Sequence, residues 1–495
     1  MAKAPSSCAE TLADVGDWSP EDAFAWLIRP VTIETFFKEY WEKRPLHISR
    51  QGATCPRLLT LELINKEVGK KPGLQFEKDL NLAQCVKGKQ VMRNGTGRVT
   101  QAAVSRAVSE GCSVQVVHPQ RFVRPLAVLL SKLESHFGCL WGGNSFYTPK
   151  GMRGFKAHHD EVEVFMMQLE GAKHWRLYSC PSGPLPRSYC WDYDETALGS
   201  PILEATVRAG DLLYLPRGTI HCGAACEGMS HHLTISTYQR ASWADFLARA
   251  LPDALEKASA ADCRYRAGIP LRGLCIAGES HRKASGDVAA GDEFRSKLEE
   301  LVLGLGAFVP PAMDTAADFL AAQFIARRLP PPPRTDRSCR GPEPPTGEHC
   351  ELKQHRSLDV RWADPTCVRV VFESQPGGAA ETQIYHSLEN SIAGHMSQAE
   401  PQPACLVLPG DEWLPALRKL NCAVSWVCAS EITGPEGTAW ELLHNLWEQG
   451  LVETRESPEV PMTGDGCRKI RRAKRSRIEH QVVRGAVGSS RDRGN

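Results

Sequence analysis

The chain of 495 residues is longer than one hydrophobic core normally supports, so two or three domains are expected. Its 59 Lys and Arg against 58 Asp and Glu leave a formal net charge of +1, which excludes a bulk electrostatic attraction to nucleic acid or membrane. The N-terminal sequence lacks the apolar core of a secretory signal, and no apolar run is long enough to span a bilayer. We therefore expect an intracellular protein with no membrane partner.

Two short helices are the first predicted elements, after a flexible segment at residues 1–18. Ser19 and Pro20 have the side chains of an N-cap and a first-turn residue, and Pro30 ends the first helix. Apolar residues then repeat with helical spacing at Ile33, Phe36, Phe37, Tyr40 and Trp41. This spacing predicts a second amphipathic helix whose aromatic side chains belong to the core.

Short apolar runs broken by Gly, Pro and Asn dominate from about residue 75 to residue 240. Examples are "SVQVVHPQ", "VEVFMMQLEG", "KHWRLYSCP" and "LTISTY". Many short strands with this punctuation are typical of an antiparallel barrel or sandwich. We predict that residues 19–240 form a mostly β domain that includes the N-terminal helices.

The later part of the chain changes its pattern several times. Residues 241–328 have helical periodicity with Ser242 as a cap, residues 329–352 form a proline-rich linker, and residues 353–455 read as a small α+β, winged-helix-like domain. Residues 456–495 are expected to be a disordered basic tail, because seven of the ten residues from Arg468 to Arg477 are Lys or Arg. This run favours nuclear import; a nucleic-acid-binding arm at residues 468–477 and a solubilising tail are the alternatives.

A candidate metal site begins at His158-His159-Asp160, at the head of the alternating apolar run. Side chains alternate along a strand, so His158 and Asp160 share one face while His159 points the other way with Glu161. An imidazole and a carboxylate on one face are two ligands of the 2-His-1-carboxylate triad of non-haem Fe(II) oxygenases. The spacing alone is weak, because 16 His and 58 acidic residues predict about two chance matches in 495 positions.

A third ligand is offered by His221 in the downstream segment "AGDLLYLPRGTIHCG". There a buried strand is broken by Pro216-Arg217-Gly218 just before the histidine. A strand, a tight turn and a histidine some sixty residues after an H-x-D are typical of the cupin and Jumonji double-stranded β-helix. Alone, His221 would be a histidine at the end of a strand whose ring nitrogens are hydrogen-bonded within the protein. Together with His158 and Asp160, however, it predicts an Fe(II) site.

Three protein ligands leave the opposite face of octahedral iron open to a chelating 2-oxo acid and O2. The second carboxylate of 2-oxoglutarate would then need a buried cation or hydroxyl donors. Lys173, expected on the strand after a turn at Gly171, is the candidate cation, although an isolated lysine is more often a solvated surface group. Thr234 and Ser236 share a face of "LTISTY" and are the candidate hydroxyls.

The motifs together resemble the ribosomal oxygenases, a family of Jumonji-C proteins with two paralogous branches. The resemblance runs through "ETFFKEYWEKRPLHI", "HPQRF", "HHDEVEVFMMQLEGAKHWRLY", "GDLLYLPRGTIH", "LTISTYQRASWADFL" and "IYHSLENS". These stretches are collinear and cover most of residues 31–455. Some are closer to one branch and some to the other.

The resemblance implies a fold, an activity and partners. It implies a Jumonji-C barrel, a helical dimerisation domain and a C-terminal winged helix. It also implies Fe(II)- and 2-oxoglutarate-dependent hydroxylation of a histidine in a large-subunit ribosomal protein, in the nucleus and nucleolus, with a role in ribosome biogenesis. Matched motif by motif, His158, Asp160 and His221 are the iron ligands and Lys173 binds 2-oxoglutarate.

The sequence departs from the family pattern at two places near the site. His159 stands where the family has Tyr, on the face directed away from the metal. The family motif Asn-x-Tyr corresponds to Asn144-Ser145-Phe146 here, and the nearest tyrosine, Tyr147, lies one residue after the position of the family tyrosine. We therefore expect Asn144 and Tyr147 to contribute to the cosubstrate site, with the hydroxyl contribution in question.

Two further hypotheses compete with histidine hydroxylation. The same oxidant would allow demethylation of a histone H3 lysine and a role as a chromatin and transcription regulator, which would require a pocket for a methylammonium group. A non-catalytic nuclear scaffold built on the dimerisation and winged-helix regions is the non-enzymatic alternative. Its mark would be a broken triad, and this triad is intact.

Overall fold

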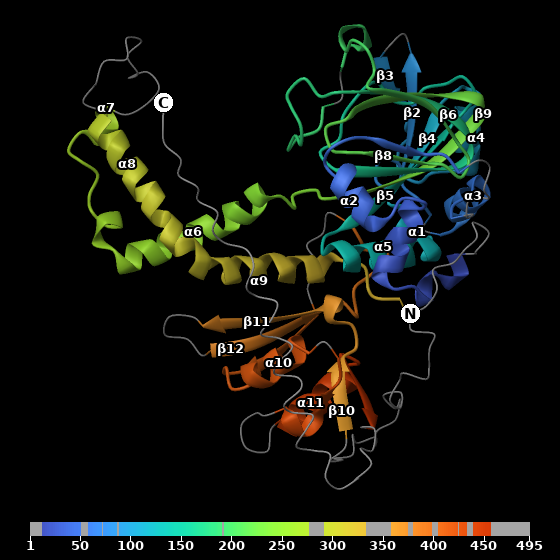
Figure 1. The fold of residues 1–495 in the computed structure, drawn as a ribbon. Coiled ribbons are helices and arrows are strands. Elements are labelled where there is room, and N and C mark those ends of the chain that lie inside the picture. Colours follow the sequence, from blue (N-terminus) through green and yellow to red (C-terminus); the bar gives the residue numbers. More distant parts are fainter. Residues whose placement is uncertain are drawn as a thin grey trace, which may run out of the picture.

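A nine-stranded antiparallel β-structure forms the first half of the protein (Figure 1). The computed structural model describes residues 12–50, 58–71, 73–86, 89–190, 193–276, 292–332, 358–374, 380–397, 404–423, 425–432 and 439–456. The strands are β1 (Leu46–Ile48), β2 (Leu80–Val86), β3 (Lys89–Met92), β4 (Ser113–Val117), β5 (Trp141–Thr148), β6 (Glu163–Tyr178), β7 (Leu203–Arg208), β8 (Leu212–Leu215) and β9 (Ile220–Thr237). Their order is β1-β8-β6-β9-β5-β4-β2-β3, with β7 also paired to β6. The predicted mostly β region is confirmed.

The long strands β6 and β9 pair along their whole length, from Glu163 opposite Thr237 to Tyr178 opposite Ile220. The register shifts near Gly171, which has φ +65°. A Cβ at Gly171 would collide with the carbonyl oxygen of Met229, so the close approach of the two backbones requires glycine. The predicted turn at Gly171 is therefore wrong, because the residue lies in a bulge that bends one continuous strand.

Five helices pack beside the β-structure: α1 (Pro20–Ile28), α2 (Ile33–Glu39), α3 (Leu61–Gly69), α4 (Gln101–Ser109) and α5 (Arg124–Phe137). The first two confirm the sequence prediction, and Ser19 forms a capping box with Asp22. Phe36 of α2 packs against Phe165 and Tyr214 of the sheet, with ring centroids 5.8 and 4.8 Å away. The helices α3, α4 and α5 were not expected from the sequence.

A helical arm extends away from the β-structure and returns to it (Figure 1). It contains α6 (Trp243–Ala261), α7 (Gly273–Ile276), α8 (Asp292–Leu305) and α9 (Val309–Arg327). Ser242 caps α6 through a capping box with Asp245, as its position in the sequence predicted. None of the helices in the described part of the chain is long and apolar enough to cross a membrane.

The C-terminal region contains two three-stranded antiparallel sheets and a separate hydrophobic core. The strands are β10 (Leu358–Trp362), β11 (Val368–Ser374), β12 (Ala380–His386), β13 (Ala404–Pro409), β14 (Val427–Cys428) and β15 (Val452–Glu456). The helices are α10 (Leu414–Asn421) and α11 (Ala439–Glu448), and β15 follows α11, so this region contains both helices and strands. The basic run from Arg468 to Arg477 lies outside the described residues.

A buried polar cluster joins the C-terminal region to the barrel. His395 and Glu134 are both fully buried, and Nε2 of His395 donates to Oε1 of Glu134 at 3.0 Å. Gln120, also fully buried, donates to Nδ1 of the same imidazole at 3.1 Å. The other oxygen of Glu134 accepts from the backbone N–H of Leu329, directly after α9, at 2.7 Å. One carboxylate thus connects α5, the end of the arm and the loop after β12.

Replacing His395 with Ala should lower the free energy of unfolding by about 2 kcal/mol, because a buried carboxylate loses a hydrogen-bond donor and a cavity remains. Urea unfolding followed by tryptophan fluorescence measures the change. The matched control is His444→Ala, which removes a partly exposed imidazole 3.6 Å from Glu448. That exposed pair should contribute less than about 0.5 kcal/mol. Equal effects of the two substitutions would contradict the stabilising role of the buried cluster.

Candidate metal centre and cosubstrate cavity

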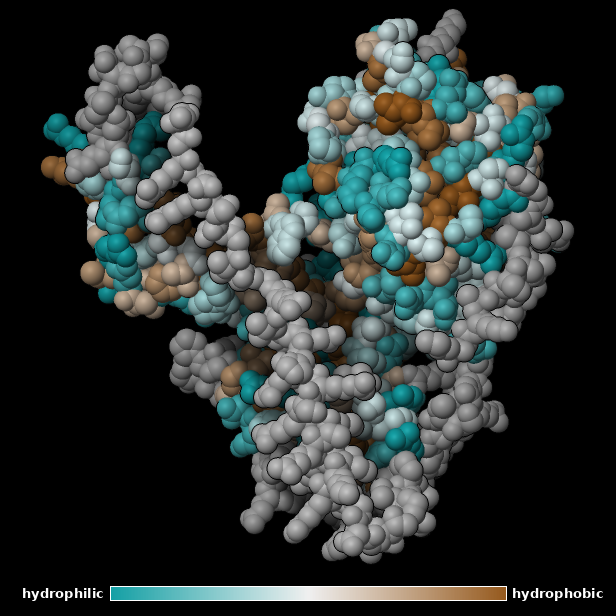
Figure 2. Space-filling model, viewed as in Figure 1, coloured by the Kyte–Doolittle hydropathy of each residue, from teal (hydrophilic) through white to brown (hydrophobic). Residues whose placement is uncertain are grey.

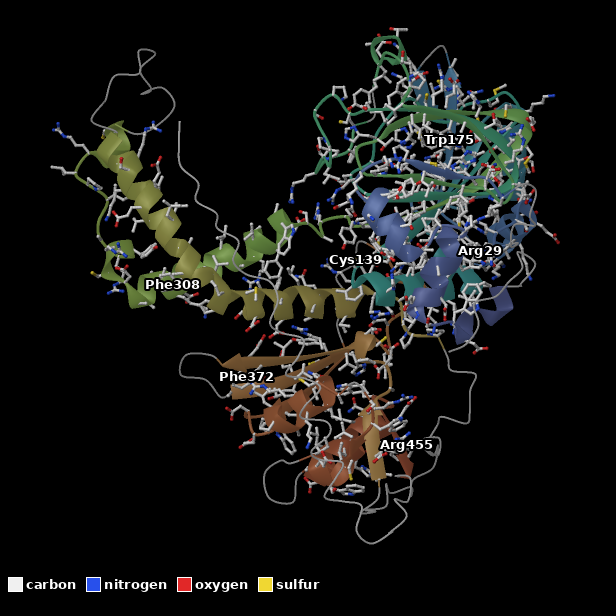
Figure 3. All side chains as sticks on the ribbon, viewed as in Figure 1. Arg29, Cys139, Trp175, Phe308, Phe372 and Arg455 are labelled. Atoms are coloured by element: carbon white, nitrogen blue, oxygen red, sulfur yellow. The ribbon has the colours of Figure 1, made fainter. Side chains whose placement is uncertain are left out.

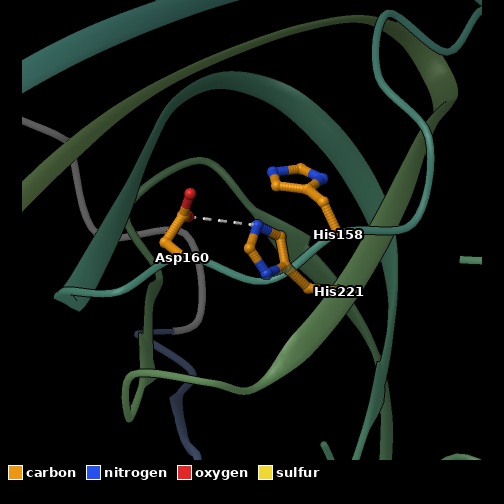
Figure 4. Close-up of side chains that lie close together, drawn as sticks. All are labelled: His158, Asp160 and His221. Atoms are coloured by element: carbon orange, nitrogen blue, oxygen red, sulfur yellow. Dashed lines mark ion pairs between the residues drawn. The ribbon is translucent and has the colours of Figure 1, made fainter. Parts of the chain in front are cut away.

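His158, Asp160 and His221 converge at one end of the bent β6–β9 pair (Figure 4). One ligand atom from each of the three lies within 4.8 Å of the others, and Nε2 of His221 is 3.8 Å from Oδ2 of Asp160. His158 and His221 face each other in an isolated antiparallel bridge. The bridge and the start of β9 therefore bring together residues that are more than sixty positions apart in the sequence.

The backbone fixes the orientation of both imidazoles. Nδ1 of His158 donates to the carbonyl oxygen of Lys156 at 2.7 Å, and Nδ1 of His221 donates to that of Thr219 at 3.0 Å. With Nδ1 protonated in each ring, Nε2 keeps the lone pair that a metal ion needs. The backbone N–H of Gly218 donates to the carbonyl oxygen of Asp160, which ties the acid to the loop before His221.

His159 points away from this cluster, as strand alternation predicted. Its Nδ1 bonds to the hydroxyl of Tyr193 and its Nε2 to the carbonyl oxygen of Ser188, both at 2.9 Å. Both ring nitrogens are therefore occupied by partners on the outer side of the segment. His159 is a structural neighbour of the candidate ligands and has no free nitrogen to offer.

Burial sets the protonation of the candidate ligands. Desolvation lowers the pKa of His221 well below its ordinary value, and the nearby His158 lowers it further. Desolvation also raises the pKa of the Asp160 carboxyl, against the opposing effect of His158. A neutral imidazole is the metal-binding form, and a buried carboxylate is stabilised by a cation. The cluster therefore has the charge preference of a cation site.

A cavity of about 220 Å³ opens beside the three residues. Its lining includes the predicted residues Asn144, Lys173, Thr234 and Ser236, and the hydrophobic side chains of Phe146, Phe155, Met166 and Trp175. Thr234 Oγ1 and Asn144 Oδ1 are buried and have no hydrogen-bond partner among the described residues. A polar ligand in the cavity would satisfy these atoms.

Lys173 is the buried lysine of this cavity and is only 5 % exposed. Within the described structure, no hydrogen bond or ion pair is formed by its Nζ. Desolvation, followed by the charge of Arg153, lowers the pKa of Lys173 to about 7. A buried ammonium of this kind gains most from an anionic ligand, so the cavity fits a carboxylate at this position.

Tyr147 does not reach the cavity. The residues of β5 alternate, so Asn144 and Phe146 face inward while Tyr147 lies on the opposite face, with its ring 6.3 Å from that of His231. The expectation that Tyr147 contributes to the cosubstrate site is therefore wrong, because its side chain lies on the face of β5 away from the cavity. Phe146 occupies the inward position and has no hydroxyl.

Among the cavity residues that were not predicted from the sequence, Trp175 and His232 could have been found from strand alternation. Trp175 has the same parity as Lys173 on β6, and His232 has the same parity as Thr234 on β9. Figure 3 places Trp175 within the β-structure. The imidazole of His232 is 3 % exposed, stacks on Phe146 and has no hydrogen-bond partner for Nδ1 among the described residues.

The donor set fits Fe(II) and a 2-oxo dicarboxylic acid. Two imidazoles and one carboxylate are the ligand types of non-haem Fe(II) sites that retain open coordination positions. The orphaned hydroxyl of Thr234 and the unpaired ammonium of Lys173 are donors suited to a carboxylate. Cation-binding and anion-binding groups therefore face the same cavity.

Comparisons with known proteins agree with this site. A family model described as "JmjC domain" matches residues 115–246. Ribosomal oxygenase 2 of Bos taurus is 35% identical over 448 residues, which cover 88% of this chain and 92% of the bovine protein. Ribosomal oxygenase 1 of Danio rerio is 35% identical over 311 residues, covering 62% and 56% of the two chains. The protein is thus of the Jumonji-C class, and it belongs to the ribosomal oxygenase family.

Two further similarities are more distant. The bifunctional lysine-specific demethylase and histidyl-hydroxylase NO66 of Aedes aegypti is 30% identical over 442 residues, covering 87% of this chain and 67% of that protein. Among solved structures, the Escherichia coli ribosomal oxygenase YcfD aligns with a TM-score of 0.45 at 16% identity, covering 86% and 98% of the two chains.

Single substitutions should separate the metal ligands from their neighbour. His158→Ala, Asp160→Ala and His221→Ala each remove one of three ligands, and we expect each to weaken Co(II) binding by at least about 100-fold. His159→Ala, the matched control, should bind Co(II) like the unsubstituted protein, because both of its nitrogens face away from the cluster. Titration followed by visible absorption measures the affinity. Normal binding by His158→Ala would refute the ligand assignment.

Proposed function

We propose that this chain is an Fe(II)- and 2-oxoglutarate-dependent oxygenase that hydroxylates a histidine side chain of a large-subunit ribosomal protein. The observation that carries the proposal is the convergence of His158, Asp160 and His221 on the same cavity as a buried, unpaired Lys173. Membership of the ribosomal oxygenase family supports the choice of substrate. The proposed role is in ribosome biogenesis.

In the proposed reaction, the substrate C–H bond, O2 and 2-oxoglutarate give the C–OH group, succinate and CO2. When bound, Fe(II) supplies the activation of O2 that this chemistry needs. His158, Asp160 and His221 would hold the metal through one face and leave the other face to the cosubstrate. Lys173 and Thr234 would bind the carboxylate farther from the metal, and the apolar walls, among them Phe155 and Met166, would exclude water.

Demethylation of a histone H3 lysine is the second candidate. The aromatic side chains of Phe146, Phe155 and Trp175 line the cavity, and aromatic faces attract methylammonium groups. The relatives named NO66 are described as both demethylase and histidyl-hydroxylase. A purely structural nuclear scaffold is disfavoured, because a buried lysine without an ion pair beside a His-Asp-His cluster lowers stability unless it binds a ligand.

We further propose that the arm, residues 241–328, is a dimerisation domain. Its helix α6 turns Ala250, Ala254 and Ala258 inward, all fully buried, and packs on α9. The larger Leu247, Leu251 and Leu255 are 40 to 51 % exposed along the same helix. Burying alanine while exposing leucine is unfavourable for an isolated helix pair, so a second copy is the proposed cover for this leucine stripe. Hydrophobic residues are visible on the surface of the arm in Figure 2.

The remaining regions carry proposals of their own. Residues 353–455 are proposed to be a winged-helix-like domain, supported by the succession of α10, α11 and β15; an experimental structure without a recognition-helix arrangement would contradict this. The basic run at residues 468–477 supports localisation to the nucleus and nucleolus. Imaging of a fluorescent fusion with this run replaced by Ser and Gly would test it, and unchanged localisation would contradict the proposal.

The leucine stripe can be tested by charge. Leu251→Glu places a carboxylate in the middle of the proposed interface, so light scattering should show a monomer where the unsubstituted chain is a dimer. Val86→Glu, a control at a 37 % exposed apolar residue of the barrel, should leave the dimer intact. A monomer in the unsubstituted chain would contradict the dimer proposal.

Mass spectrometry decides between the two proposed reactions. Large-subunit ribosomal proteins and methylated H3 peptides are each incubated with the protein, Fe(II), 2-oxoglutarate and air. We expect a ribosomal histidine to gain one oxygen atom, and we expect no gain when 2-oxoglutarate is left out. The rate of this hydroxylation should fall by at least about 100-fold in His158→Ala and stay unchanged in His159→Ala. Loss of H3 methyl groups alone would favour the demethylase. If the metal-loaded protein modifies neither substrate, the result would favour the non-catalytic scaffold.

A further inference from the structure

The ammonium of Lys173 rests on an aromatic face. Its Nζ lies 4.6 Å from the ring centroid of Trp175, two residues further along β6, so both side chains point into the cavity. Among the described residues, Nζ forms no hydrogen bond or ion pair beside this contact. A cation over an indole is attracted by the negative face of the ring, and the attraction is strongest where water is excluded. Trp175, at 5 % exposed, provides such a place.

Trp175 is itself held from two sides. A Cβ on Gly223 would lie 2.7 Å from Cε3 of the indole and 3.0 Å from Cε of Lys173, so glycine is needed for the ring and the lysine to lie this close to β9. On another side, the ring of His232 meets the indole edge to face at 5.4 Å and 86°. His232 in turn stacks on Phe146 at 5.0 Å and 13°. The indole therefore has little freedom to rotate away from the lysine.

We infer that Trp175 is a positioning residue for the cosubstrate, which keeps the ammonium of Lys173 directed at the 2-oxoglutarate carboxylate that lies farther from the metal. This inference rests on the proposed function, because it takes 2-oxoglutarate as the ligand. An ammonium carries three N–H donors, so one side of it can face the indole while another donates to a carboxylate. Trp175 acts through Lys173, and its contribution is confined to ligands that carry the second carboxylate.

The inference can be tested with two ligands that differ only in the second carboxylate. Calorimetric titration of the Mn(II)-loaded full chain compares 2-oxoglutarate with 2-oxopentanoate, which has the same 2-oxo acid group and chain length but no second carboxylate. Trp175→Leu should weaken 2-oxoglutarate binding about tenfold and leave 2-oxopentanoate binding unchanged. Trp175→Phe should fall between, because the face of Phe attracts a cation less strongly than that of Trp. The Phe variant also keeps the test valid if the Leu variant fails to fold.

A double-mutant cycle shows whether the effect passes through Lys173. Added to Lys173→Met, the Trp175→Leu substitution should cause no further loss of 2-oxoglutarate affinity. Trp413→Leu, in the C-terminal region, is the control for loss of an indole elsewhere and should bind like the unsubstituted protein. Unchanged 2-oxoglutarate affinity in Trp175→Leu, or equal loss for both ligands, would overturn the inference. Failure of the unsubstituted protein to bind either 2-oxo acid would refute the proposed function, and this inference with it.

Discussion

The bent pairing of β6 with β9 is the constraint on which the candidate site depends. The two strands run side by side at both of their ends, yet their register shifts near Gly171. Lys173 of β6 and His221 and Thr234 of β9 all line the cavity beside this bent strand pair. The close approach of the two strands at Gly171 is part of this arrangement, because a Cβ there would collide with the carbonyl oxygen of Met229.

The interior of the barrel bears charges that its own residues do not neutralise. Asp160 and Lys173 face one cavity, the pKa of the carboxyl is raised and that of the lysine is lowered, and desolvation is the main cause of both shifts. Such groups reduce the stability of the ligand-free protein. They are understandable as the two ends of a ligand site, since a metal ion would compensate Asp160 and a carboxylate would compensate Lys173. The stability of the fold must come from elsewhere, including the aromatic core around Phe36 and the cluster of Glu134 and His395.

Local patterns predicted much of this arrangement from the sequence. Strand alternation correctly predicted that the side chains of His158 and His159 point in opposite directions. The break at Pro216-Arg217-Gly218 correctly indicated that His221 lies near the start of a new strand. Strand alternation also places Tyr147 on the opposite face of β5 from Asn144, so the same rule already argued against Tyr147 as a cosubstrate residue. Helix α4 was missed because its apolar residues are few and small. The contact of Glu134 with His395 joins residues 261 positions apart, and no local pattern could reveal it.

The departure at Phe146 shows how the parts of the site depend on one another. Phe146 stands where the resemblance to the family leads one to expect a tyrosine. Its ring stacks on His232, which meets Trp175, and the indole of Trp175 faces Lys173. A hydroxyl that would donate to an anion is thus replaced by an aromatic contact that acts on the lysine at a distance. Because an ammonium is a stronger donor to a carboxylate than a phenol, a well-fixed Lys173 can compensate for the missing hydroxyl. Phe146 also leaves Asn144 and Ser236 among the uncharged polar side chains of a cavity whose other walls include the apolar Phe155 and Met166.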